Sequence, residues 1–136
     1  MTGSRTLPLV STPDAVAPVI QVFGLEKDPA TRAALRFFKE RRTAVSFVDL
    51  RKRPMSPGEL RRFIERLGAR VLVDDASRAY RDAGLGYLTL DDAGIVGRLQ
   101  SDQRLLRLPL VRHGNDVTVG RSEATWTEWI RAGVGP

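Results

Sequence analysis

Chemically reactive side chains are few in this sequence, and the missing types exclude several kinds of chemistry. The 136 residues contain no cysteine and a single histidine, His113. Without cysteine the chain cannot form a disulfide, a thiolate zinc site, an iron–sulfur centre or a thiol nucleophile. One imidazole also rules out a metal site built from several histidines. The chemistry left to the chain is mainly that of carboxylates and guanidinium groups.

The remaining candidates for catalysis or metal binding are weak. Asp74-Asp75 and Asp91-Asp92 offer oxygen ligands for a hard cation, but adjacent aspartates more often cap helices or stay solvated, and we assign them that role. His113 lies in a predicted turn with no serine or carboxylate patterned beside it, so we interpret it as a turn residue. The chain lacks a Walker loop, a GxGxxG motif and an HExxH motif, and no cofactor or metal site is predicted.

The charge balance is basic, with 22 Lys and Arg against 16 Asp and Glu, a net charge of +6. Such a balance suits nucleic acid, an anionic membrane or an acidic protein, but arginine outnumbers lysine so strongly that genome base composition is an alternative explanation. The stretch 51–53, with Arg61, Arg62 and Arg66 after it, is a candidate for contact with acidic surfaces. It has no interleaved aromatic residue for base stacking, so we expect no direct nucleic-acid binding.

The hydropathy of the sequence indicates the cellular location of the protein and the extent of its domain. No apolar run approaches the roughly 18 residues of a membrane helix. Pro8, Pro13 and Asp14 interrupt the first 17 residues, so they lack the continuous apolar core of a secretory signal. We therefore expect a cytoplasmic protein with no membrane partner, a tail over residues 1–17 and one domain over residues 18–134.

The first half of the domain alternates strand and helix signals. A β-branched and aromatic run over 19–23 predicts a strand, and Asp28-Pro29 predicts the start of a helix that continues to about residue 42. A second strand is predicted over 44–50. Because a helix joins the two strands, they are expected to run parallel. Ser56-Pro57-Gly58-Glu59 has the pattern of a capping box and begins the next helix.

The second half begins with short helical pieces and ends with a hairpin and a helix. Helical signals lie between residues 77 and 106, with starts near Ser77, Asp91 and Ser101-Asp102. Runs over 108–111 and 117–119 flank a Gly-Asn pair and predict a β-hairpin. A final helix begins at Ser122 and presents Trp126 and Trp129 to the core. The order of elements predicts an α/β protein.

Four stretches together carry a resemblance to a known family. They are the strand that ends at Gly24-Leu25, residues 48–56 with Glu59-Leu60, Tyr80-Arg81 with Gly84-Leu85, and residues 105–111 leading to Gly120. In this order and spacing they resemble the arsenate-reductase (ArsC)/Spx family of thioredoxin-fold proteins. The resemblance implies a thioredoxin-like α/β fold with an inserted helical segment and a mixed four-stranded sheet.

The sequence departs from this family at the residue that matters most. The reductases have a catalytic cysteine at the N-terminus of the first helix, where the helix dipole favours the thiolate. Asp28 stands at that position. A carboxylate is a poor nucleophile toward arsenate and cannot form a mixed disulfide. The first step of the reductase mechanism is therefore lost.

The resemblance also implies an oxyanion site built from arginines. Leu108 occupies one of the family's arginine positions, whereas Arg70 and Arg121 match two others and are expected to converge on Asp28. Arg107 is a further anion-binding candidate. The alternatives are that Asp28 is a simple N-cap and that the arginines are solvated. Pro109 resembles the family's cis-proline, and a trans proline is its alternative.

Two functions of different class follow from these observations. The first is a redox-inactive protein-binding or regulatory module, as in Spx-type relatives that contact RNA polymerase through the C-terminal domains of its α chains. The second is a small-oxyanion-binding protein or enzyme that uses Asp28 with Arg70 and Arg121. Two arginines and the helix dipole would keep Asp28 charged, which suits an ion pair better than proton transfer. We favour the binding module over an enzyme.

Overall fold

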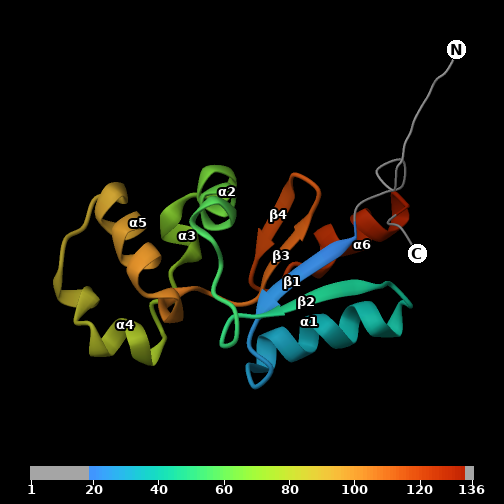
Figure 1. The fold of residues 1–136 in the computed structure, drawn as a ribbon, viewed down its shortest axis with the longest axis horizontal. Coiled ribbons are helices and arrows are strands. Elements are labelled where there is room, and N and C mark those ends of the chain that lie inside the picture. The colour runs from blue at the N-terminus through green and yellow to red at the C-terminus, as the bar shows by residue number, and fades with distance from the viewer. Residues whose placement is uncertain (1–18, 134–136) are drawn as a thin grey trace, which may run out of the picture.

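The computed structural model describes residues 19–133 (Figure 1). The tail predicted over residues 1–17 lies outside the described residues. Within them, no helix has both the length and the apolar character needed to cross a membrane.

The domain begins with the predicted strand–helix–strand unit. Strands β1 (Ile20–Gly24) and β2 (Val45–Asp49) pair in parallel, and helix α1 (Pro29–Glu40) joins them. Both residues predicted to start the helix do so: Asp28 caps α1 and Pro29 lies in its first turn. The helix buries Thr31, Ala34, Phe37 and Phe38 on the side opposite its charged residues.

Helix α2 (Pro57–Leu67) follows a linker and begins with only half of the predicted capping box. The Ser56 Oγ accepts a hydrogen bond from the Glu59 N–H at 3.2 Å. The Glu59 carboxylate does not return to Ser56, because it binds Arg112 of the sheet at 3.1 and 3.2 Å.

The predicted helical segment is confirmed as a set of short pieces, which we call the helical insert (residues 69–107). It comprises α3 (Ala69–Leu72), α4 (Arg78–Asp82), the 3₁₀ turn η2 (Leu85–Tyr87), α5 (Asp92–Ser101) and the 3₁₀ turn η3 (Gln103–Leu105). Ser77, Asp91 and Asp102 cap the pieces that follow them. Helix α3 was not predicted, because four residues are too few to show a helical period.

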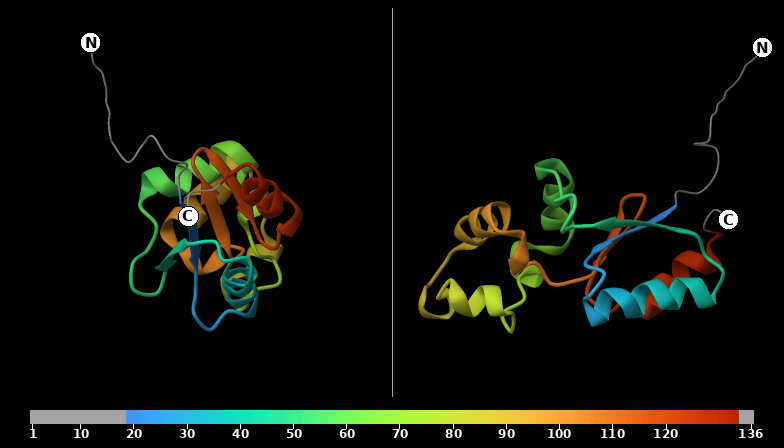
Figure 2. Two further views of the ribbon diagram at one scale, coloured as in Figure 1. Left: turned by 90° about the vertical axis from the view of Figure 1, so that its right-hand side faces the viewer. Right: turned by 60° about the horizontal axis from the view of Figure 1, so that its bottom comes forward.

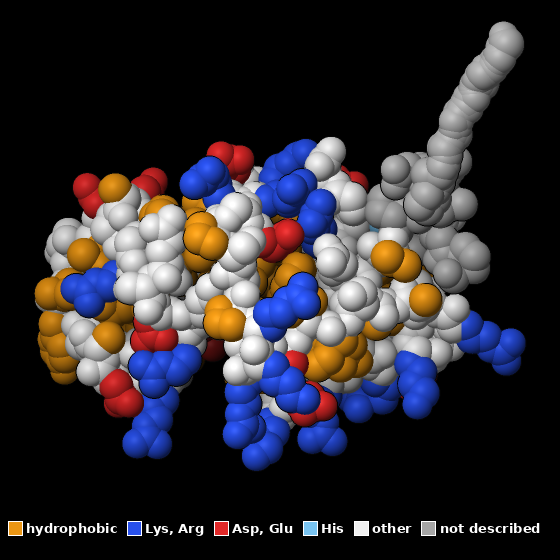
Figure 3. Space-filling view, in the orientation of Figure 1, with side chains coloured by type: hydrophobic (Ala, Val, Ile, Leu, Met, Phe, Trp, Pro, Cys, Tyr) orange, Lys and Arg blue, Asp and Glu red, His pale blue; other side chains and the backbone are white. Residues whose placement is uncertain are grey.

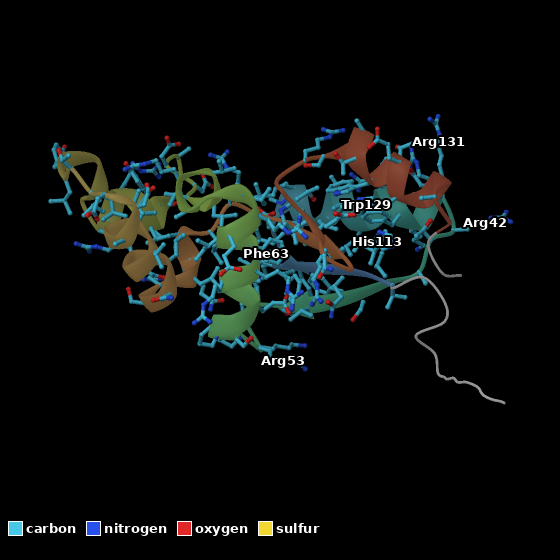
Figure 4. All side chains as sticks on the ribbon, turned by 90° about the horizontal axis from the view of Figure 1, so that it is seen from above. Arg42, Arg53, Phe63, His113, Trp129 and Arg131 are labelled. Carbon is cyan, nitrogen blue, oxygen red and sulfur yellow. The ribbon has the colours of Figure 1, made fainter. Side chains whose placement is uncertain are left out.

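The hairpin and the last helix complete the domain. Strands β3 (Leu110–His113) and β4 (Asp116–Val119) are antiparallel, and α6 (Glu123–Arg131) follows. The Leu108–Pro109 peptide is cis, as the resemblance implied, and β3 begins two residues later than predicted, after this proline without an N–H donor. The interpretation of His113 as a turn residue is wrong. It ends β3, and its ring lies 5.4 Å from that of Trp129 (Figure 4).

The sheet is mixed and four-stranded, as predicted, in the order β2-β1-β3-β4. Helices α1 and α6 cover one face, where Phe38 and Trp126 are almost fully buried (Figure 2). The predicted core role of Trp126 and Trp129 is confirmed. The other face packs against α2, and this core continues into the helical insert through Leu72, Leu99 and Leu105.

The helical insert extends beyond the end of the sheet (Figure 1). A pair of hydrogen bonds ties it to the linker before α2. The Gln103 Oε1 accepts from the Met55 N–H at 2.9 Å, and the Gln103 Nε2 donates to the Met55 carbonyl at 2.8 Å. The junction between the sheet and the insert is therefore held by side-chain packing and by a specific polar contact.

Candidate functional site

The N-terminus of α1 is occupied by a side chain of the protein itself. The Asp28 Oδ2 accepts hydrogen bonds from the Thr31 N–H and the Thr31 Oγ1, each at 2.8 Å. Thr31 is fully buried, so the carboxylate is held against the first turn. An ionised cap in this place satisfies one of the free N–H groups of the helix and interacts favourably with its dipole. The arrangement stabilises the helix and supplies no thiol nucleophile.

Asp28 borders an open groove of about 600 Å³ between the sheet and the helical insert. Three predicted site residues, Asp28, Arg107 and Arg121, line it together with Leu108. Arg104 also lines the groove and was not predicted, since its position is set by the turn η3. The groove therefore places the guanidinium groups of Arg104, Arg107 and Arg121 near the N-terminus of α1.

Arg70 does not reach this groove. Its Nε donates to Asp92 at 3.1 Å and its terminal nitrogen donates to the Leu90 carbonyl at 2.7 Å. It borders a separate hollow of about 230 Å³ inside the helical insert. The short helix α3 is the reason, because it directs Arg70 toward the start of α5.

The expected ion pair of Asp28 with Arg70 and Arg121 is wrong. Arg121 lines the groove, but its Nε binds Glu123 at 2.9 Å and its side chain is 74% exposed. No ion pair joins Asp28 to a cation within residues 19–133. Instead of binding Asp28, Arg70 binds Asp92 and Arg121 binds Glu123.

Arg107 is anchored by main-chain carbonyl groups. Its Nε lies 3.4 Å from the Val71 carbonyl oxygen and its terminal nitrogen lies 3.2 Å from that of Val73. Gly120 lies beside it, and a Cβ there would stand 3.4 Å from the Arg107 side chain. The guanidinium is held between the two hollows, since both are lined by Arg107.

Arg104 is paired within its own turn. The Asp102 carboxylate accepts from the Arg104 Nε and terminal nitrogen, both at 2.9 Å. These hydrogen bonds lower the pKa of the Asp102 carboxyl below its ordinary value, and burial opposes the effect. The same pairing raises the pKa of the Arg104 guanidinium. Both groups are therefore charged at neutral pH and bound to each other.

Sequence reasoning missed a polar cluster on the α2 side of the sheet. Arg112 of β3 binds Glu59 of α2, and the two side chains are only 23% and 20% exposed. Arg112 also donates to the Gly114 carbonyl at 2.7 Å. Because Glu59 and Arg112 are 53 residues apart, no local spacing could reveal the pair. Its role is to join α2 to the hairpin.

A metal site finds no support in the described part of the chain. Residues 19–133 contain no group of three His, Cys, Asp or Glu side chains placed to hold an ion. Asp91 instead caps α5 by accepting from the Gly94 N–H at 2.8 Å, and Asp92 binds Arg70. Both contacts agree with the interpretation of these aspartates as caps and surface charges.

The comparisons with known proteins agree with this architecture. The chain matches the model described as ArsC family over residues 23–129. A putative ArsC family related protein from Bacteroides fragilis superposes with a TM-score of 0.72 at 16% identity, covering 80% of this chain and 95% of that one. The arsenate reductase from Vibrio cholerae superposes with a TM-score of 0.69 at 20% identity, covering 82% of this chain and 98% of that one.

A third structure, a protein from Staphylococcus aureus, gives a TM-score of 0.66 at 23% identity, covering 81% of this chain and 97% of that one. At these identities the structural matches show a shared fold. No protein with a curated description matches the sequence.

Proposed function

The chain belongs to the ArsC family, and we propose that it is a redox-inactive member that acts by binding another protein. The observation that carries the proposal is Asp28, which caps α1 at the position the resemblance gives to the catalytic cysteine. Since the chain has no cysteine, no other thiol can take over the attack on arsenate. A thioredoxin-like scaffold without the catalytic thiol still has the surface with which it can bind another protein.

The specific form of the proposal is a regulatory protein of the Spx type in the cytoplasm, with RNA polymerase as its partner by family analogy. This chain retains the scaffold, while the polar groups of its site bind one another. Asp28 is bound to Thr31, and Arg121 to Glu123. Leu108 precedes the cis-proline where the resemblance places an arginine.

Affinity capture from a lysate of the source organism tests the proposal. The wild-type protein is immobilised and the retained proteins are identified by mass spectrometry at moderate salt. We expect a stoichiometric partner, and recovery of RNA polymerase would support the specific form. An unrelated basic protein of equal net charge serves as the control. Retention no greater than that of the control would contradict the binding function.

A second candidate function is supported by the groove. Asp28, Arg107 and Arg121 line it together, and its guanidinium groups are suited to a small oxyanion. This candidate predicts that sulfate or phosphate raises the melting temperature, and that Arg121→Ala abolishes the increase. Arg78→Ala, outside the groove, should retain it. An increase shared by both variants would indicate general salt stabilisation and would exclude the candidate.

The substitution Asp28→Cys tests the structural position on which the proposal depends. A thiol at the start of α1 lies in the positive field of the helix and beside the groove arginines. We expect its pKa to fall below the ordinary value of about 8.5. A pKa at or above that value, measured by thiolate absorbance, would show that this position is not the electropositive site of the family.

A further inference from the structure

The net positive charge of the protein comes from one part of the chain. Residues 19–68 contain 12 Lys and Arg against 6 Asp and Glu, whereas residues 69–133 contain 9 of each sign. The first segment therefore holds a net charge of +6, equal to that of the whole chain. An arginine-rich genome would enrich both segments alike, so base composition does not explain why only one of them is unbalanced.

The two segments also differ in how their cations are bound. In residues 69–133, seven of the nine cations form a hydrogen bond or an ion pair with a carboxylate or a carbonyl oxygen: Arg70, Arg78, Arg81, Arg104, Arg107, Arg112 and Arg121. In residues 19–68, Arg41 and Arg62 are the only ones that do so with a described residue. Most of the excess charge is thus left to solvent or to a partner.

Helix α1 concentrates several of these unpaired cations on its exposed side. Arg32, Arg36 and Lys39 form an exposed stripe opposite the buried face. Arg32 and Arg36 are four residues apart, where like charges repel. The first turn of α1 also contains no acidic residue beyond the cap, unlike those of α2, α5 and α6. Asp28 and Glu40, each four residues from one of these arginines, offset part of the repulsion. No ion pair with a described residue holds the stripe, which leaves it available to an external ligand.

The linker after β2 extends the same surface. Lys and Arg side chains gather over α1 and over the loop from β2 to α2 (Figure 3), and Arg53 projects away from the body of the domain (Figure 4). Hydrogen bonds from the Arg51 and Lys52 N–H groups to Asp49, both 3.0 Å, hold this loop as an ordered turn. We call the surface formed by Arg32, Arg36, Lys39, Arg51, Lys52 and Arg53 the basic face.

We propose that the basic face is the docking surface for an acidic segment of a partner protein, an inference that rests on the proposed binding function. Charge complementarity favours an anionic partner, and exposed guanidinium groups can bind the carboxylates of an acidic polypeptide in a bidentate manner. A single-stranded nucleic acid would find no aromatic side chain within the face on which its bases could stack.

A defined probe and a matched pair of variants test the inference. The probe is a fluorescent 20-residue polyglutamate peptide, and a 20-base-pair duplex DNA is the comparison ligand. The face variant is R32Q/R36Q/K39Q. The control variant R78Q/R98Q/R131Q removes the same net charge from residues 69–133. Thermal unfolding verifies that both variants fold.

We expect the face variant to bind polyglutamate about tenfold more weakly than wild type, and the control variant to stay within about twofold, as three exposed ion pairs predict. Equal losses in the two variants would reduce the effect to net charge and overturn the inference. Tighter binding of duplex DNA than of polyglutamate, lost in the face variant, would also overturn it in favour of a nucleic-acid surface.

The capture experiment separates this inference from the proposed function. If wild type retains a partner from the lysate and the face variant retains it equally well, the docking surface is wrong and the binding function stands. If wild type retains nothing, the binding function fails, while the polyglutamate measurement still decides whether the face selects acidic polypeptide. Loss of the partner in the face variant alone supports both.

Discussion

Residues 19–68 and residues 69–133 share a hydrophobic core but use their charged side chains in opposite ways. The second segment pairs most of its arginines internally, as Arg70 does with Asp92 and Arg104 with Asp102. The first leaves the stripe on α1 without partners among the described residues. Charges that bind each other serve the fold, whereas charges without an internal partner are available to another molecule.

The segments share one sheet through the pairing of β1 with β3, and side-chain contacts between them include two that can be tested by substitution. Phe63 of α2 lies in the core that contains Leu72 and Leu99 of the helical insert. Glu59 of α2 binds Arg112 of β3. If the two segments unfolded separately, their different charge patterns would describe two independent bodies.

The largest expected effect comes from Phe63→Ala. Phe63 is fully buried and its ring meets that of Phe23 edge to face at 5.9 Å. Its removal should cost about 3–5 kcal/mol of unfolding free energy, in a single urea transition seen by both tryptophan fluorescence and far-UV circular dichroism. Tyr87→Ala, at a side chain 95% exposed, is the control and should change stability by less than about 0.5 kcal/mol. Two separate transitions would show that the segments fold independently.

The next effect tests the ion pair that joins the segments. Glu59→Gln leaves the largely buried Arg112 without its carboxylate, which should cost about 1–3 kcal/mol. Glu65→Gln, on the exposed side of the same helix, should be nearly neutral. A double-mutant cycle with Arg112→Gln isolates the coupling between the two side chains. A coupling energy near zero would show that the pair does not hold α2 to the hairpin.

Local signals predicted the parts of the molecule whose causes are local. Asp28 and Pro29 start α1 where expected, because an N-cap and an N-terminal proline act within one turn. Trp126 and Trp129 face the core because their three-residue spacing suits one side of a helix. The cis peptide before Pro109 came from the family resemblance and not from local spacing.

The candidate site was predicted less well, because its geometry depends on distant contacts. Arg70 turns to Asp92, 22 residues away, and no pattern near Arg70 indicates that choice. The groove does bring Asp28, Arg107 and Arg121 together, which required the relative positions of the sheet and the insert. The charge division between the segments can be counted in the sequence, but only the structure shows which charges are paired.

Removing one arginine from each segment should change stability by different amounts. Arg70→Gln deletes the contacts to Asp92 and to the Leu90 carbonyl and should cost about 1 kcal/mol. Arg36→Gln removes both the repulsion from Arg32 and the attraction to Glu40, each four residues away, and should change stability by less than about 0.5 kcal/mol. Urea unfolding at low ionic strength measures both. A larger destabilisation by Arg36→Gln would mean that the stripe contributes to the fold and would weaken the case for an external ligand.

The smallest effect concerns acid stability within the insert. Arg104 lowers the pKa of Asp102, so the folded protein holds this carboxylate ionised to a lower pH than the unfolded chain does. The resulting stability is present above the unfolded aspartate pKa of about 3.9 and is lost as pH falls through the lowered folded value. Asp102→Asn retains an oxygen to cap η3 but removes the charge. Urea midpoints at about pH 6 and about pH 3 should therefore differ slightly less in the variant than in wild type, because the Arg104 partner is well exposed and solvent screens the pair. An identical difference in both proteins would show that the internal pairing of the insert does not contribute to its stability, and would remove this pair from the contrast with α1.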